Sequence, residues 1–182
     1  TERNKRNNHV GGVLWLTGLS ASGKTTIASK VERKLFDKGY NIYMLDGDNL
    51  RDGLNSNLGF SDQDRNENIR RASEVANILA ESGFIVIASF ITPTKENREI
   101  AKSNNSTKFY EVYISASIKK CEERDPKGLY KKARLGEIKD FTGISADYEE
   151  PKDPDIIIDT ETLSEMESSD ILINYIEKNF PI

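Results

Sequence analysis

The sequence contains a single cysteine, Cys121, which excludes an intrachain disulfide and a zinc site built from several cysteines. Long hydrophobic runs are also missing: the longest, such as residues 84–88, have only the length of a strand and could not span a bilayer. Nor is there an excess of basic residues, because 26 Lys and Arg stand against 30 Asp and Glu, a net charge of −4. This balance argues against a protein that grips long nucleic acid through its backbone charge. We therefore expect neither a membrane protein nor a nucleic-acid-binding protein.

The rest of the composition is that of a globular protein. Hydrophobic residues make up 36% of the 182 residues and charged residues 31%, which is enough apolar material for one core. We expect a single domain over residues 11–182, preceded by a polar arm at residues 1–10 in which His9 is solvated. No apolar stretch of signal-peptide type follows that arm, which favours a cytoplasmic, reducing location.

Short apolar runs alternate with stretches of helical periodicity. Strands are predicted at residues 13–17, 41–45, 84–89, 109–114 and 156–158, and helices at 23–38, 64–82, 116–124 and 163–179. This alternation is typical of βαβ crossovers, so we expect an α/β fold with a mostly parallel five-stranded sheet and helices on both faces. Residues 125–154 are rich in Lys, Gly, Asp and Pro and show no continuous apolar face, which favours a mobile lid over about residues 125–150.

The strongest chemical signal lies between the first predicted strand and the first predicted helix. Residues 18–25 read Gly-Leu-Ser-Ala-Ser-Gly-Lys-Thr, a complete G-x-x-x-x-G-K-[ST] motif, or P-loop. Gly18 and Gly23 let backbone N–H groups surround phosphate oxygens, and the helix adds the positive end of its dipole. Lys24 would neutralise the β- and γ-phosphates, and the Thr25 hydroxyl would bind Mg²⁺. An ordinary glycine-rich turn is the weaker alternative, because motif and context agree.

Two carboxylates mark the end of the second predicted strand. Asp46 and Asp48 lie in the sequence Asp-Gly-Asp-Asn, with Arg51 shortly after. Groups at the carboxyl ends of parallel strands converge on the ligand crevice. Two acids there can hold a water of Mg²⁺ and accept the proton of an attacking hydroxyl. Spacing alone does not decide which aspartate is the base, although we favour Asp46. The alternative is that this tetrapeptide only forms a turn and has no catalytic role.

Further candidate ligands follow in two segments. The Ser61 hydroxyl is expected to cap the helix at 64–82. Arg65 and Asn68, three residues apart on that helix, could bind one anion together, although a solvated charged face is an equally good interpretation. In the predicted lid, Lys139 and the neighbouring basic residues are typical of anion clamps. Phe141 could either stack on a base or fill a small core under the lid.

Together these segments resemble the adenylylsulfate kinase (APS kinase) family, P-loop kinases that phosphorylate the 3′-hydroxyl of adenosine 5′-phosphosulfate (APS). The matching blocks extend from about residue 13 to residue 158 and are GLSASGKT at 18–25, LDGDNLR at 45–51, LGFSDQDRNENIRR at 58–71, FITP at 90–93, RDPKGLYKKAR at 124–134 and IKDFTGI at 138–144. The P-loop occurs in many families, whereas the other blocks in this order are far more specific. The resemblance implies a P-loop kinase fold that uses Mg²⁺ and ATP to convert APS into 3′-phosphoadenosine 5′-phosphosulfate (PAPS).

The resemblance also implies a role for each matching residue. ATP would be held by Arg124, near its base, and by the P-loop residues Gly18, Leu19, Ser20, Ala21, Ser22, Gly23, Lys24, Thr25 and Thr26. Lys24, Asp46 and Asp48 would be catalytic, with Thr25 and Asp46 toward Mg²⁺. APS would be bound by Arg51, Phe60, Arg65, Asn68, Ile91, Thr92, Pro93, Lys139 and Phe141, with the two phenylalanines on opposite faces of its adenine. The resemblance further implies a homodimer, with an ATP sulfurylase as a candidate partner.

Two positions depart from the family pattern. Thr92 stands where the family usually has a serine that has been proposed as a phosphorylated intermediate in some members, and Thr94 replaces an aromatic residue. Direct transfer needs no such intermediate. Two other functions stay open: a small P-loop kinase for another alcohol, and a regulatory module that binds nucleotide without transfer. Phe60 and Phe141 argue against the first, because a sugar offers no base to stack, and the intact Lys24 argues against the second.

Overall fold

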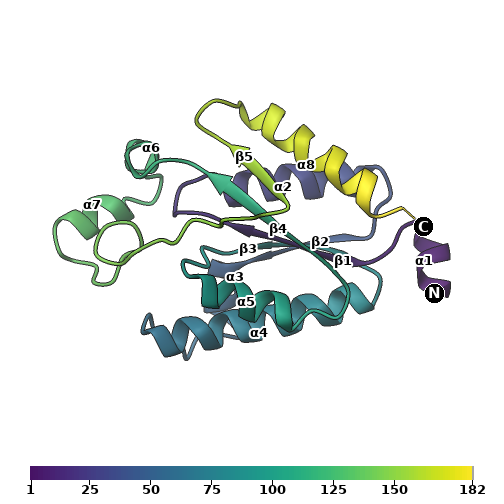
Figure 1. Ribbon diagram of the computed structural model, residues 1–182, viewed down its shortest axis with the longest axis horizontal. Helices are drawn as coiled ribbons and strands as arrows, with labels where there is room; N and C mark the ends of the chain where they lie inside the picture. The colour runs from purple at the N-terminus through teal and green to yellow at the C-terminus, as the bar shows by residue number, and fades with distance from the viewer. Residues whose placement is uncertain (182) are drawn as a thin grey trace.

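The computed structural model describes residues 1–181 and contains all five predicted strands (Figure 1). They are β1 (Gly12–Thr17), β2 (Ile42–Asp46), β3 (Ile85–Ser89), β4 (Lys108–Ser115) and β5 (Ile156–Asp159). The longer helices are α2 (Lys24–Asp37), α4 (Asp62–Glu81), α5 (Lys95–Ser103) and α8 (Glu165–Asn179). Shorter helices are α1 (Glu2–Asn7), α3 (Gly47–Asp52), α6 (Ile118–Arg124) and α7 (Leu129–Arg134). The predicted α/β class is confirmed.

The five strands form one parallel sheet in the order β2-β3-β1-β4-β5. In the central strand β1, Leu14 pairs with Ile87 of β3 on one side and with Tyr110 of β4 on the other. Every residue of β1 and β3 is buried, as expected for parallel strands with helices on both faces. Because β3 and β4 pair with opposite edges of β1, the loops at the carboxyl ends of these strands diverge, and a crevice forms between them.

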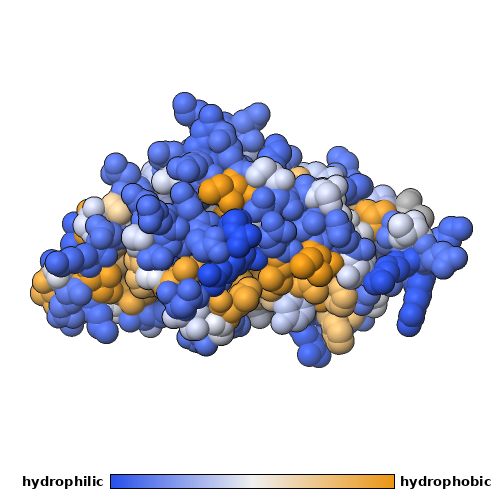
Figure 2. Space-filling view, turned by 90° about the horizontal axis from the view of Figure 1, so that it is seen from below, coloured by the Kyte–Doolittle hydropathy of each residue, from blue (hydrophilic) through white to orange (hydrophobic). Residues whose placement is uncertain are grey.

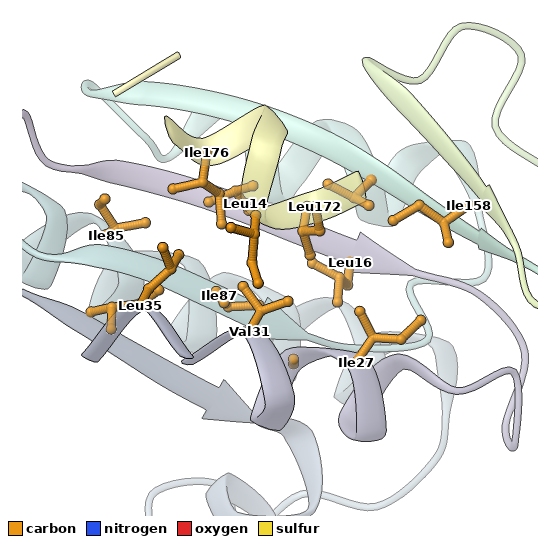
Figure 3. Packing of buried hydrophobic residues seen from close by; sticks show 14 of the residues in the cluster. Leu14, Leu16, Ile27, Val31, Leu35, Ile85, Ile87, Ile158, Leu172 and Ile176 are labelled. Atoms are coloured by element: carbon orange, nitrogen blue, oxygen red, sulfur yellow. The ribbon is translucent and has the colours of Figure 1, made fainter. Parts of the chain in front are cut away.

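Two apolar layers hold the helices to the sheet. On one face, α2 and α8 pack against β1 through residues such as Leu16, Val31 and Leu172 (Figure 3). On the other face, α4 and α5 cover Trp15 and its neighbours (Figure 1). Each fully buried aliphatic side chain contributes about 1.5–3 kcal/mol relative to an exposed one. The rigid sheet can therefore carry a site made of loops at its carboxyl end.

The N-terminal residues are docked on the domain, and His9, which the sequence predicts to be solvated, is buried. His9 is only 1% exposed; its Nε2 accepts a hydrogen bond from the Asn41 backbone N–H at 3.0 Å, and its ring stacks on Tyr40. The Asn7 side chain donates to the Gly83 carbonyl at 3.0 Å. The prediction for His9 was wrong because hydrogen bonds, which leave no apolar pattern in the sequence, attach this segment.

The segment from residue 125 to 150 carries the short helix α7, which packs on a small apolar core of the kind that the sequence left open for Phe141. Tyr130 of α7 packs with Leu19, Ala116 and Cys121, and Phe141 lies against this cluster. Figure 2 shows hydrophobic side chains gathered at the end of the molecule where Figure 1 places α7. Within residues 1–181, no helix is both long and apolar enough to cross a membrane.

Candidate active site

The loops after β1, β2 and β3 enclose one cleft with a volume of about 1050 Å³. Sites for a small ligand measure roughly 300–1,000 Å³, so this cleft lies at the upper end of that range. It is lined by most of the predicted site residues, namely Ser20, Ala21, Gly23, Lys24, Thr25, Thr26, Asp46, Asp48, Arg51, Phe60, Arg65, Asn68, Ile91, Thr92, Pro93, Arg124, Lys139 and Phe141. Gly18, Leu19 and Ser22 do not line the cleft, because they are buried on the inner side of the P-loop.

The P-loop backbone has the conformation that its two glycines permit. Gly18 has a φ of 152°, and a Cβ there would lie 2.4 Å from the Ile114 carbonyl oxygen, so only glycine fits. Gly23 precedes α2 with a φ of 104°, in the left-handed region. The free backbone N–H groups at the start of this 14-residue helix therefore lie beside the cleft, a setting that suits phosphate.

Lys24 is buried under its own loop. Its side chain is 8% exposed, and its ammonium donates hydrogen bonds to the carbonyls of Gly18 at 3.0 Å and Leu19 at 2.7 Å. Burial lowers the pKa of Lys24 to about 8, against the opposing influence of Cys121 and the two aspartates. Two carbonyl oxygens thus hold a cation that a phosphate group would hold more strongly, because charge-assisted bonds to an anion are shorter and stronger.

Thr25 and Asp46 bring two oxygen atoms together at the edge of the P-loop. The Thr25 hydroxyl donates to Asp46 Oδ2 at 2.9 Å, while Asp46 Oδ1 accepts from the Asp48 backbone N–H and caps α3. A hydroxyl and a carboxylate are oxygen ligands of the kind that Mg²⁺ prefers. The pair could therefore hold a Mg²⁺ ion, which would neutralise phosphate charge beside the P-loop.

Asp48 lies beside this pair and forms an ion pair with Lys127, the third residue of the predicted lid. Lys127 Nζ is its only side-chain partner within residues 1–181. The contact raises the pKa of Lys127 through the hydrogen bond to Asp48. The basic RDPKG segment signals an anion contact, but its pairing with Asp48 joins residues 79 positions apart and could not be predicted from the sequence.

Two arginines and Phe60 form a second part of the cleft wall, beside the P-loop residues that also line it. The Arg51 guanidinium lies 4.4 Å from the centre of the Phe60 ring and donates to the Gly59 carbonyl at 3.0 Å. Arg65 donates to the Phe60 carbonyl at 2.9 Å and to the Asp140 carbonyl at 2.6 Å, which ties α4 to the predicted lid. Phe60 is 61% exposed, so much of its ring is accessible to a ligand.

Phe141 lies both at the cleft and against the small core under the lid, the two positions that the sequence left open. It lines the cleft, and its ring meets Tyr130 edge-on with the centroids 5.0 Å apart. Lys139, two residues earlier, also lines the cleft. Stacking on a base and packing under the lid are therefore both compatible with its position.

Arg124 and Thr160 brace the P-loop from the side of β5. Arg124 donates to the Thr160 hydroxyl at 3.0 Å and to the carbonyls of Ala21 and Ser22, each at 3.3 Å. The Thr160 hydroxyl donates in turn to the Ser22 carbonyl at 2.8 Å. Thr160 lines the cleft but was missed from the sequence, because it follows a short strand without a motif.

The parallel sheet, the P-loop before α2 and the paired aspartates at the end of β2 define the protein as a P-loop kinase. The family described as adenylylsulphate kinase matches residues 10–159, and the chain belongs to this family. It is 53% identical over 178 residues to the adenylyl-sulfate kinase of Bacillus pumilus, covering 97% of this chain and 90% of the relative. An adenylyl-sulfate kinase of Staphylococcus carnosus is also 53% identical, over 97% of this chain and 89% of its own.

Solved structures agree with this assignment. The APS kinase of Mycobacterium tuberculosis in complex with AMPPNP and APS aligns with a TM-score of 0.89 and 47% identity, over 92% of this chain and 98% of its own. A gluconokinase from Sinorhizobium meliloti aligns over 92% of this chain and 93% of its own with a TM-score of 0.61, but at 13% identity it shares only the fold.

Proposed function

We propose that the protein transfers the γ-phosphoryl group of ATP to the 3′-hydroxyl of APS, giving PAPS and ADP, as part of sulfate activation. The observation that carries this proposal is a single cleft that is lined both by the P-loop and by Arg51, Phe60 and Arg65. Such a wall suits an anionic nucleotide, because it combines cations with an open aromatic face. The related M. tuberculosis enzyme holds AMPPNP and APS together, which supports the same pairing here.

Catalysis in this proposal depends on positioning and charge neutralisation. Mg²⁺, bound at Thr25 and Asp46, would neutralise charge on the phosphates of ATP. Lys24 leaves the carbonyls of its own loop and binds the β- and γ-phosphates. The Thr25 hydroxyl and the Asp48 backbone N–H already donate to the two oxygens of Asp46, which would also bind Mg²⁺. We therefore assign the general base to Asp48, which also lines the cleft, in place of Asp46. Asp48 accepts the proton of the 3′-hydroxyl once Lys127 has released it.

Recognition of APS divides between its base and its anionic groups. The adenine lies between Phe60 and Phe141, and each stacked aromatic ring contributes about 1–3 kcal/mol. Arg51, Arg65 and Lys139 bind the phosphosulfate. Residues 91–93 form the wall of the same pocket, and Asn68 donates a hydrogen bond to the substrate. Arg124 lies near the base of ATP.

The remaining features of the proposal follow from family resemblance. We propose that residues 125–150 act as a mobile lid over both nucleotides, that the protein is a homodimer, and that it works in the cytoplasm beside an ATP sulfurylase. One relative, the hexameric APS kinase from Thiobacillus denitrificans, is 25% identical and much longer, since the match covers 30% of it. Sedimentation velocity of the purified protein tests the homodimer directly.

The decisive experiment is a test of acceptor choice. ADP release from Mg²⁺–ATP is measured with APS, AMP, gluconate and shikimate, and the product of the APS reaction is identified by mass. We expect turnover with APS alone, because the other acceptors lack either the phosphosulfate or the base. Turnover of another acceptor without turnover of APS would assign the site to a different small-molecule kinase. Tight ATP binding without any transfer would favour the regulatory module.

A further inference from the structure

A pair of buried asparagines joins the loop after α3 to the substrate side of the cleft. Asn55 is fully buried, and its Nδ2 donates a hydrogen bond to Asn68 Oδ1 at 3.0 Å. The same nitrogen lies 3.5 Å from the Asn68 backbone carbonyl. The backbone carbonyl is an oxygen whichever way the Asn68 amide lies, so the amino group of Asn55 must face Asn68, and the orientation of the Asn55 amide is determined.

Asn55 is held in this position by the loop around it. Its backbone N–H donates to the Leu50 carbonyl at 2.7 Å, and its own carbonyl accepts from the Leu58 N–H at 3.0 Å. Its Oδ1 is sealed from solvent and accepts no hydrogen bond from any residue in the range 1–181. A sealed acceptor without a partner is unfavourable. The favourable interaction of this side chain is the hydrogen bond from its Nδ2 to Asn68.

This hydrogen bond decides which end of Asn68 faces the cleft. Asn68 is 6% exposed and lines the cleft, one helical turn after Arg65. With its Oδ1 engaged by Asn55, its Nδ2 is left over, and no protein atom within residues 1–181 accepts from it. That nitrogen is also absent from the sealed polar atoms without partners, so it retains access to the cleft.

We propose that Asn55 is a positioning residue for substrate recognition: it fixes the amide of Asn68 so that the cleft receives a hydrogen-bond donor and not an acceptor. A donor at this place, beside two arginines, suits a substrate whose phosphosulfate, ribose and base are rich in acceptor atoms. Asn55 itself does not line the cleft and acts only through Asn68. This inference rests on the proposed APS kinase activity and assigns a residue to the specificity of that site.

The first experiment reverses the amide. Asn55→Asp keeps the shape of the side chain but replaces the donor by an oxygen, so Asn68 should turn and present its own oxygen to the cleft. We expect the KM for APS to rise by about tenfold, the loss typical of one hydrogen bond to a charged group, while the KM for ATP and kcat change less than about threefold. Asn105→Asp is the matched control, because Asn105 likewise donates to a carbonyl and has a sealed Oδ1, but lies away from the cleft.

A second pair of variants separates positioning from a general effect on folding. Asn55→Leu removes the donor without adding charge and should also raise the KM for APS, but not when Asn68 is already alanine. Asn68→Asp can still accept the hydrogen bond from Asn55 and should fold normally, yet it presents a carboxylate oxygen to the cleft. Its KM for APS should therefore rise at least as much as in Asn68→Ala.

Three results would overturn the inference. They are equal increases in KM for APS and ATP in the Asn55 variants, an effect of Asn55→Leu that persists in the Asn68→Ala background, and normal APS binding by Asn68→Asp. The last measurement does not depend on whether the Asn55 variants fold. Failure of the unmodified protein to phosphorylate APS is a different outcome, which would reject the proposed function and with it this role of Asn55.

Discussion

The indole nitrogen of Trp15 donates a hydrogen bond to the Thr92 hydroxyl at 3.2 Å, and both side chains are buried. Thr92 has a φ of 44°, unusual for a β-branched residue. Its carbonyl accepts from the Arg98 guanidinium at 3.2 Å and from the Thr17 hydroxyl at 3.3 Å. The turn that carries Ile91 and Pro93 to the cleft is therefore held by buried polar contacts, and the Thr92 hydroxyl is part of this support.

We accordingly expect Thr92→Ala to lose stability and to keep its activity. The variant leaves the Trp15 N–H without its partner, which costs about 1–3 kcal/mol. Its kcat should stay within about threefold of the parent, because direct transfer needs no acceptor at this position. Thr92→Ser, which retains the hydroxyl, serves as the control and should melt close to the parent. Complete loss of transfer in Thr92→Ala, together with phosphate found on Thr92 of the parent, would contradict this expectation.

Lys24 should be required for activity, although its burial should lower the stability of the folded protein at neutral pH. Its pKa of about 8 lies below its ordinary value of 10.5, so between these pH values the unfolded chain holds a proton that the folded protein has lost. Lys24 therefore makes stability rise with pH across this window, by on the order of 3 kcal/mol in total. Lys24→Met should abolish transfer and show a smaller rise in the free energy of unfolding between pH 7 and pH 10. Urea denaturation at both pH values measures the free energy of unfolding. If this free energy rises equally in parent and variant, Lys24 is not a buried cation.

The two aspartates should differ in what their loss changes. Asp48→Asn removes the proposed base and should lower kcat by about 10²–10⁴-fold with little change in nucleotide binding. Asp46→Asn removes a Mg²⁺ ligand and should also raise the Mg²⁺ concentration needed for half-maximal rate. Steady-state kinetics across a Mg²⁺ series compares them. Normal kcat in both variants would reduce residues 46–49 to a turn.

The strands were predictable because their apolar runs are local signals, but α5 was not. The buried face of α5 consists of Asn97, Arg98 and Ala101, so apolar periodicity could not reveal it. Its N-cap is Thr94, one of the two residues that depart from the family pattern. Hydrogen bonds and an ion pair to Glu111 hold this helix in addition to the apolar contacts of Ile100 and Ala101.

The candidate site divides along the same line. The P-loop and the aspartates at the end of β2 could be read from the sequence, since a motif of eight or four residues contains most of the chemistry. The pairings of Lys127 with Asp48 and of Asn55 with Asn68 could not, because they depend on how separate loops meet at the cleft. The sequence therefore identified which residues gather in the cleft, but not which of them orient or cover the others.

Phe141 gives the sharpest test of the substrate side, because its two contacts predict two separate losses. Phe141→Ala should weaken APS binding by about 5- to 150-fold through lost stacking. It should also lower the melting temperature slightly, since the ring packs on Tyr130. Ile144→Ala is the matched control: Ile144 packs against the same cluster but does not line the cleft, so only the melting temperature should fall. ATP affinity without APS should change little in either variant. Titration of both nucleotides beside melting curves decides the matter, and equal losses of ATP and APS affinity in Phe141→Ala would show that this ring supports the lid and does not stack on the substrate.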